Sequence, residues 1–132
     1  MGDLTTNFSR WEFECQCGTD CGYIAVDFEL VNVLQDLVEH FKTKYGQRVS
    51  VEITGPNRCP PHNKAENGAP GSKHQFCIAA DFKVKLVDTN HKINPREVYD
   101  YLDIKYTGKF GIGLYHNRVH LDIRPERARW GI

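Results

Sequence analysis

The strongest constraint on the fold is a switch in hydrophobic spacing between residues 27 and 54. Apolar side chains first recur every three to four residues, the period of an amphipathic helix, at Val31, Leu34, Val38, Phe41 and Tyr45. Asp27 is placed to cap this helix and Gly46 to end it. The following "VSVEIT" alternates apolar and polar residues, which predicts a half-buried strand that ends near Thr54.

A second strand and a second helix follow further along the chain. Residues 81–86 alternate in the same way and predict a strand whose polar face begins with Asp81. The stretch "NPREVYDYL" predicts a short helix that runs to about Ile104, because Asn94 is a favourable N-cap and proline occupies the first helical position.

A long loop and a hairpin complete the pattern. Residues 55–73 carry four of the six prolines and several glycines, so we expect an irregular loop, of a length that is usually functional. The stretch "FGIGLYHNRVHLDIR" predicts a hairpin that turns at His116 and Asn117. The two-residue period of its second strand puts His120 and Asp122 together on the polar face.

Length and charge limit what these elements can build. A chain of 132 residues can bury roughly two thirds of its unfolded surface in one core, so we expect a single α+β domain over residues 1–132, a small antiparallel sheet with flanking helices. Seventeen basic residues balance seventeen acidic ones, which argues against nucleic acid as a partner. No apolar run approaches the roughly 20 residues of a membrane span, and the N-terminus lacks the order of a signal peptide. We therefore expect a soluble protein made in the cytoplasm.

The five cysteines are odd in number, which argues against a fully paired disulfide framework. Cys15, Cys17 and Cys21 could hold a soft metal ion with Cys59 or Cys77 as the fourth ligand, although the chain has no Cys-x-x-Cys pair. We prefer the simpler interpretation, that these are buried or reduced thiols near a loop.

His74, Asp81 and His120 are residues of the types that a catalytic zinc site uses. Such a site takes three protein ligands and leaves a fourth position open. His74 lies where the long loop enters the strand of Asp81, and His120 lies on the polar face of another strand, so neighbouring strands could bring the three together. The spacing alone is equally compatible with a loop histidine beside a surface aspartate.

The surrounding residues carry a family resemblance. The stretches "SKHQFCIAAD", "VHLD" and "ARW" resemble the zinc D-Ala-D-Ala carboxypeptidase family of metallopeptidases, whose pattern runs Ser-x-His, six residues, Asp and a distant His-x-Asp. The stretches "NFSRWEFEC", "ITGPNRCPPHN" and "GIGLY" extend the likeness over nearly the whole chain, which is most similar to the small branch found in phages and murein hydrolases. The resemblance implies the fold that these peptidases share with hedgehog signalling domains.

The resemblance also implies roles for individual residues. It implies a bound Zn²⁺ ion with three ligands, His74, Asp81 and His120. Arg58 would lie near the ion and steady the substrate or the oxyanion of the tetrahedral intermediate. Asp122 is our candidate general base, because it shares a face with His120. It could instead orient His120 or form an ion pair with Arg124.

Other positions depart from the family's pattern or have two interpretations. Asn117 stands three residues before the last histidine ligand, where other branches carry the Glu or Asp that transfers the proton. His116 could assist as an acid, although a solvent-exposed turn histidine is the simpler interpretation. Cys77 replaces a common glycine and is expected to be a small buried residue. Trp130 is expected to pack rather than to bind substrate.

The implied function is hydrolysis of a D-amino-acid-containing amide in peptidoglycan stem peptides, by a carboxypeptidase or an endopeptidase. In the absence of a signal peptide, this activity fits a phage or prophage murein hydrolase, an endolysin or a virion component, that acts at the bacterial cell wall. One alternative is a zinc-binding interaction module of the same fold that has lost turnover, which Asn117 favours. Another is a metal-binding or redox module built on Cys15, Cys17 and Cys21.

Overall fold

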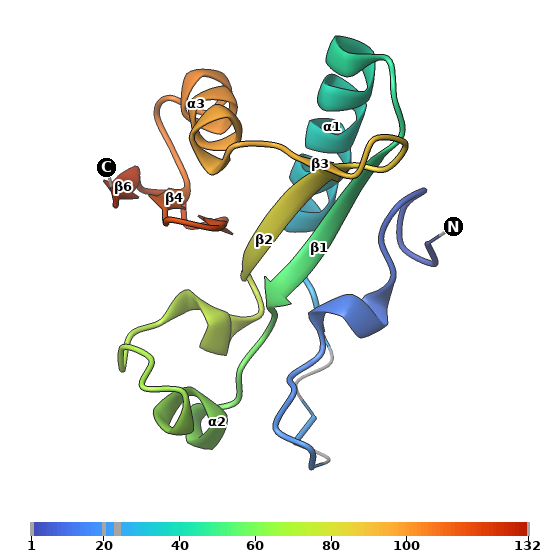
Figure 1. Cartoon of the computed structure of the whole chain (residues 1–132). Coiled ribbons are helices and arrows are strands. Elements are labelled where there is room, and N and C mark those ends of the chain that lie inside the picture. The colour runs from blue at the N-terminus through green and yellow to red at the C-terminus, as the bar shows by residue number, and fades with distance from the viewer. Residues whose placement is uncertain (1, 20, 23–24, 132) are drawn as a thin grey trace.

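Six strands form one sheet in the order β1–β2–β5–β4–β6, with β3 paired to β2 (Figure 1). These features come from a computed structural model, which describes residues 2–19, 21–22 and 25–131. The strands are β1 (Val49–Gly55), β2 (Ala79–Leu86), β3 (His91–Lys92), β4 (Gly111–Leu114), β5 (Val119–Asp122) and β6 (Ala128–Trp130). Paired strands run antiparallel, except that β4 and β6 are parallel. The predicted α+β class is confirmed.

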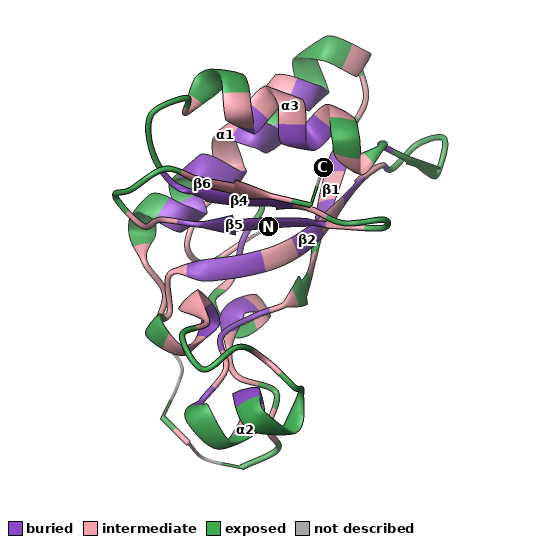
Figure 2. Cartoon of the chain, turned by 90° about the vertical axis from the view of Figure 1, so that its left-hand side faces the viewer, coloured by how far each residue is buried: buried purple, intermediate pink, exposed green. Residues whose placement is uncertain are grey.

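Two helices, α1 (Phe28–Tyr45) and α3 (Pro95–Lys105), cover one face of this sheet (Figure 2). The side chain of Asp27 caps α1 by accepting a hydrogen bond from a backbone N–H at 2.7 Å, as expected. Gly46 ends α1 at φ 64°, a left-handed conformation that suits glycine. The Asn94 side chain caps α3 in the same way at 2.9 Å. Local sequence signals therefore set both helix ends.

The hydrophobic core lies between these helices and the sheet. Strands β2 and β5 turn alternate residues toward it, and the N-terminal segment adds two further aromatic side chains. The largest fully buried side chains include Phe8, Phe13, Phe41, Phe82, Phe110, Leu30, Leu34, Leu37 and Leu102. Each such side chain contributes about 1.5–3 kcal/mol by leaving water, so the core holds the sheet in place as a rigid support for its other face.

Short helical segments complete the described part of the chain. They are the 3₁₀ helices η1 (Arg10–Phe13) and η2 (Lys73–Phe76) and the helix α2 (Pro60–Ala65). The prediction that residues 55–73 are irregular is wrong at α2. Its two prolines stand in the first turn, where the missing backbone N–H groups would have no helical partner anyway.

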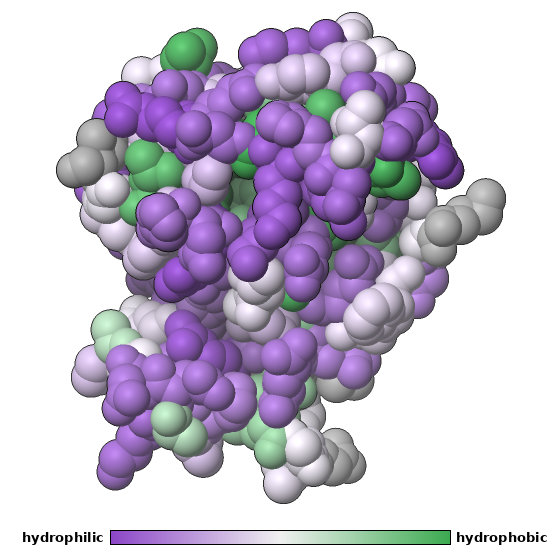
Figure 3. All heavy atoms as spheres, viewed as in Figure 1, coloured by the Kyte–Doolittle hydropathy of each residue, from purple (hydrophilic) through white to green (hydrophobic). Residues whose placement is uncertain are grey.

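Hydrophilic side chains dominate the visible face of the molecule (Figure 3). In Figure 3, apolar side chains are visible only in scattered places. Among the described residues, no helix combines the length and the apolar character that crossing a membrane requires.

Candidate metal centre

The register of the sheet brings Asp81 and His120 side by side. Asp81 of β2 pairs with His120 of β5, and His120 pairs in turn with Gly113 of β4. Successive residues of a strand point to opposite faces. Because Phe82 and Val119 lie in the core, Asp81 and His120 point away from the face that α1 and α3 cover.

The 3₁₀ helix η2 supplies His74. The hydroxyl of Ser72 caps this helix by accepting a hydrogen bond from the His74 N–H at 3.3 Å. The Nδ1 atom of His74 lies 2.9 Å from the carbonyl oxygen of Pro56. A carbonyl only accepts, so Nδ1 carries the proton and Nε2 keeps its lone pair. That Nε2 atom faces Asp81, with 3.4 Å to its Oδ1.

The three predicted ligands therefore meet at one point. One ligand atom from each of His74, Asp81 and His120 lies within 4.8 Å of the others. Oδ1 of Asp81 is 3.4 Å from His74 Nε2 and 2.9 Å from His120 Nδ1. Tetrahedral zinc with bonds of about 2.0–2.1 Å needs ligand atoms roughly 3.3–3.5 Å apart. Two imidazoles and one carboxylate at this spacing fit Zn²⁺, and they leave a fourth position for water or substrate.

The charges of the centre favour a cation. Burial alone would raise the pKa of Asp81, but the hydrogen bond with His120 and the electrostatic influence of both His120 and His74 outweigh it and hold the pKa well below its usual value. Burial likewise opposes protonation of His120, but its contacts with Asp122 and Asp81 raise its pKa overall. Asp81 is therefore anionic over a broad pH range, and a metal ion at Nδ1 of His120 would replace a proton there.

Asp122 lies behind His120 and is fully buried. Its Oδ2 atom is 2.7 Å from Nε2 of His120 and 2.8 Å from Nη2 of Arg124, and its Oδ1 atom is 2.7 Å from Nε of Arg124. Burial would raise its pKa, but these contacts outweigh burial and lower it. Both carboxylate oxygens are thus engaged away from solvent. The contacts correspond to the two alternatives to a general base, orientation of His120 and an ion pair with Arg124.

Arg58 is tied directly to the loop that carries His74. Its backbone N–H donates to the His74 carbonyl oxygen at 2.9 Å, and its Nη2 donates to the hydroxyl of Ser72 at 3.2 Å. Its Nε atom is buried and has no hydrogen-bond partner within the described part of the chain.

Two further residues lie beside the centre, Arg118, which the sequence analysis did not single out, and Trp130, which it did. Nε of Arg118 lies 3.8 Å from Oδ2 of Asp81, and the Trp130 ring centre lies 5.0 Å from that of His120. A Cβ atom at Gly113 would come within 2.4 Å of the Trp130 ring, so this glycine makes room for it. The two-residue period could have placed Arg118 beside His120. Trp130 packs as expected, but on β6, a strand that we did not predict.

The turn between β4 and β5 is exposed at both predicted positions, His116 and Asn117. Both residues, together with Arg118, line a groove of about 980 Å³ that continues along β2 and residues 90–98. The three predicted metal ligands are not part of its lining. Arg118 therefore connects this groove to the metal centre.

A second group of metal-binding side chains lies apart from the first. Cys15, Cys17, Cys21 and Cys59 bring their sulfur atoms within 4.8 Å of one another. All five cysteines are in the thiol form, and Cys77, half-buried at the end of η2, lies outside the group. The grouping gives geometric support to the metal-binding alternative, and the thiols are reduced, as our preferred interpretation allowed.

Comparison with known proteins agrees with this geometry. The family model described as peptidase M15 matches residues 6–122, a span that contains all three predicted ligands as well as Arg58 and Asp122. No curated protein and no solved structure matches the chain. Since the family match covers most of the sequence, the chain belongs to the peptidase M15 family, the zinc D-Ala-D-Ala carboxypeptidase-like metallopeptidases.

Proposed function

We propose that this zinc peptidase hydrolyses a D-amino-acid-containing amide bond in the stem peptides of peptidoglycan, as a carboxypeptidase or an endopeptidase. The observation that carries the proposal is the meeting of His74, Asp81 and His120 within 4.8 Å, in a chain of the peptidase M15 family. The finer assignment, to peptidoglycan, follows from the motifs that the chain shares with D-Ala-D-Ala carboxypeptidases.

His74, Asp81 and His120 would hold the zinc ion. When bound, zinc supplies a Lewis acid that polarises an amide carbonyl and lowers the pKa of water. The residues of the chain prepare the ligands for this task. The Pro56 carbonyl fixes the tautomer of His74, and Asp122 accepts from Nε2 of His120, so that both imidazoles present a lone pair to the same point.

Asp122 then acts as a positioning residue in this proposal. A general base must reach the proton it removes, within about 3 Å or through one water molecule. Asp122 is fully buried, and both of its oxygens are engaged by His120 and Arg124. Among the residues singled out from the sequence, His116 is the remaining candidate for proton transfer, and its exposed place in the β4–β5 turn leaves it accessible.

Arg58 would bind a negatively charged part of the substrate. A buried guanidinium N–H without a partner is costly, and a carboxylate or developing oxyanion satisfies it with a charge-assisted bond. Arg118, half-exposed between the groove and Asp81, would guide the peptide toward the centre. A stem peptide, with its terminal carboxylate, suits a site flanked by two arginines.

The biological setting follows the same assignment. A soluble peptidase of this kind would act on the bacterial cell wall, and we propose that it does so as a phage or prophage murein hydrolase. Its partners would be peptidoglycan stem peptides. The balanced charge of the chain gives no reason to add nucleic acid to them.

Muropeptide turnover tests this proposal. Purified, zinc-loaded protein would be incubated with muropeptides that end in D-Ala-D-Ala and with crosslinked dimers, and the products would be identified by mass spectrometry. We expect release of D-Ala or cleavage of the crosslink, and loss of both in His74→Ala. His40→Ala, which changes a half-buried histidine of α1 outside both the centre and the groove, is the matched control and should keep full activity. Turnover that survives His74→Ala would refute the assignment of the centre.

The second candidate function is an interaction module that binds zinc without turnover. Asn117, at the position of the usual proton-transferring acid, and the engaged carboxylate of Asp122 favour it. In this case the protein would bind zinc through His74 and leave every muropeptide intact. Zinc content and turnover measured on one sample therefore separate the two functions.

A further inference from the structure

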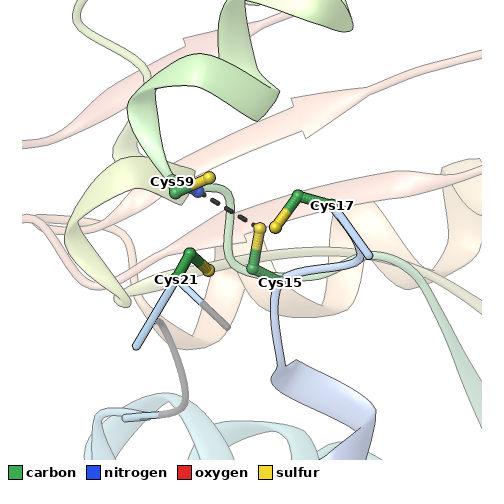
Figure 4. Close-up of side chains that lie close together, drawn as sticks. All are labelled: Cys15, Cys17, Cys21 and Cys59. Atoms are coloured by element: carbon green, nitrogen blue, oxygen red, sulfur yellow. Dashed lines mark hydrogen bonds between the residues drawn. The ribbon is translucent and has the colours of Figure 1, made fainter. Parts of the chain in front are cut away.

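Four cysteines from two distant segments converge near α2. Cys15, Cys17 and Cys21 follow η1, whereas Cys59 directly precedes α2. Figure 4 shows the four side chains grouped at one place, at the junction of these two segments. Their sulfur atoms lie within 4.8 Å of one another, and all are thiols.

The spacing suits a tetrahedral ion better than disulfides. Zinc bound by four thiolates at about 2.3 Å places neighbouring sulfur atoms roughly 3.8 Å apart. A disulfide would join two sulfurs at about 2.05 Å and would not gather the other two around the same point. The odd fifth cysteine, Cys77, stays outside the group.

The local backbone is shaped to hold thiolates. The N–H of Cys59 donates to the Cys15 sulfur at 3.3 Å, and the Thr19 hydroxyl lies 3.1 Å from the Cys17 sulfur. Hydrogen bonds of this kind stabilise negative sulfur. The segment also turns through Gly18 at φ 81°, a conformation that ordinary side chains rarely adopt. That turn lets three cysteines within seven residues face one point.

We propose that Cys15, Cys17, Cys21 and Cys59 form a second, structural Zn²⁺ site, separate from the His74–Asp81–His120 centre. Four protein ligands close the coordination sphere, so this site has no position for water or substrate. Soft thiolates in a tetrahedral arrangement select Zn²⁺ over hard cations such as Mg²⁺ and Ca²⁺.

The proposed site fastens the N-terminal segment to the loop that builds the active centre. Two backbone hydrogen bonds continue this connection. The Asn57 N–H donates to the Phe13 carbonyl oxygen at 3.0 Å, and the Arg58 N–H donates to that of His74 at 2.9 Å. Residue 59 is therefore one peptide bond away from a residue that contacts the His74 loop. The second ion would hold Arg58 and His74 in place without taking part in the reaction.

Cobalt substitution of the full-length protein tests the proposal directly. Co²⁺ bound to thiolates gives intense charge-transfer absorption in the near ultraviolet, which a histidine and carboxylate set does not give. We expect these bands in the parent protein, and about two metal ions per chain by elemental analysis. A parent protein that takes up Co²⁺ without thiolate bands would overturn the proposal. So would disulfides among the four cysteines, seen as a loss of two mass units for each bond in the intact protein.

Matched variants separate the two metal sites. Cys17→Ser combined with Cys21→Ser should lose the thiolate bands and one ion per chain, whereas the control Cys77→Ser should keep both. His74→Ala should lose one ion and keep the thiolate bands. If the His–Asp–His centre bound no metal ion, the thiolate bands would therefore still appear. If the double serine variant retained the parent's full metal content and bands, the four cysteines would not be the ligands.

Discussion

Replacement of Gly111 by alanine should disturb the metal centre by displacing Asp122, which contacts the predicted ligand His120. Gly111 of β4 pairs with Asp122 of β5, and it has no side chain to separate the two strands. A Cβ atom at this position would lie 2.4 Å and 2.6 Å from the two carboxylate oxygens of Asp122, and 2.7 Å from Nε of Arg124. All three separations are shorter than a non-bonded contact allows. Asp122 would therefore have to move, and its contact with His120 would move with it.

The expected cost follows from these contacts. Overpacking a well-packed site costs about 1–3 kcal/mol. Weakening one charge-assisted hydrogen bond of the buried carboxylate adds about 1.5–3 kcal/mol, of which relaxation recovers part. We therefore expect Gly111→Ala to lower the free energy of unfolding by about 2–4 kcal/mol. Zinc affinity of the His–Asp–His centre should fall about 10–100-fold, since Asp122 orients a ligand.

Urea unfolding at a fixed zinc concentration measures the first quantity, and competition with a chelator of known affinity measures the second. Gly108→Ala is the matched control, because a Cβ there would meet nothing within 4 Å. That change should be neutral or stabilise the fold by up to about 1 kcal/mol. If Gly111→Ala matched the control in both stability and zinc affinity, Asp122 would not be held as we describe.

Three further predictions concern single side chains. Asp122→Asn should weaken zinc binding about 10–100-fold, because a neutral amide orients His120 less firmly, and isothermal titration with zinc checks this. The hydrogen bond from Lys105 lowers the pKa of Asp36, although burial opposes the shift, so the pair stabilises the fold above about pH 4 and its contribution is lost as the pH falls further. The effect should stay below about 1 kcal/mol at this exposed site, and Asp36→Asn should reduce the drop in urea midpoint between pH 7 and pH 3. Arg129→Met should destabilise the chain by about 2–4 kcal/mol in urea unfolding, because the largely buried guanidinium donates to Asp103 and to four backbone carbonyls, and all of these bonds would be lost.

Local signals in the sequence predicted most of the fold. The stripe of α1, the caps Asp27 and Asn94 and the alternation of β2 act over a few residues, so they can be read without the structure. The helix α2 was not predicted, because its prolines are equally typical of a loop. Strand β6 was not predicted, because three residues are too few to show a two-residue period. Its parallel pairing with β4 also depends on the rest of the sheet.

The sequence likewise predicted some features of the candidate site and not others. Strand periodicity put Asp122 on the face of His120, as the structure has it. Periodicity does not indicate depth, however, and the burial of Asp122 depends on Arg124 and on the glycine opposite it. The sequence offered Cys59 and Cys77 as alternative fourth members of the cysteine group, and the structure brings Cys59 to it. Cys59 reaches the other three cysteines only because the loop of residues 55–59 runs beside the N-terminal segment, a contact between positions far apart in the sequence.

Diffraction from crystals of the zinc-loaded protein, with anomalous data collected at the zinc absorption edge, tests the central claim most directly. We predict an anomalous peak bound by Nε2 of His74, a carboxylate oxygen of Asp81 and Nδ1 of His120, with Asp122 still on Nε2 of His120. No zinc peak at this point, or zinc bound elsewhere with the three side chains paired only to one another, would contradict the assignment of this centre as the active site.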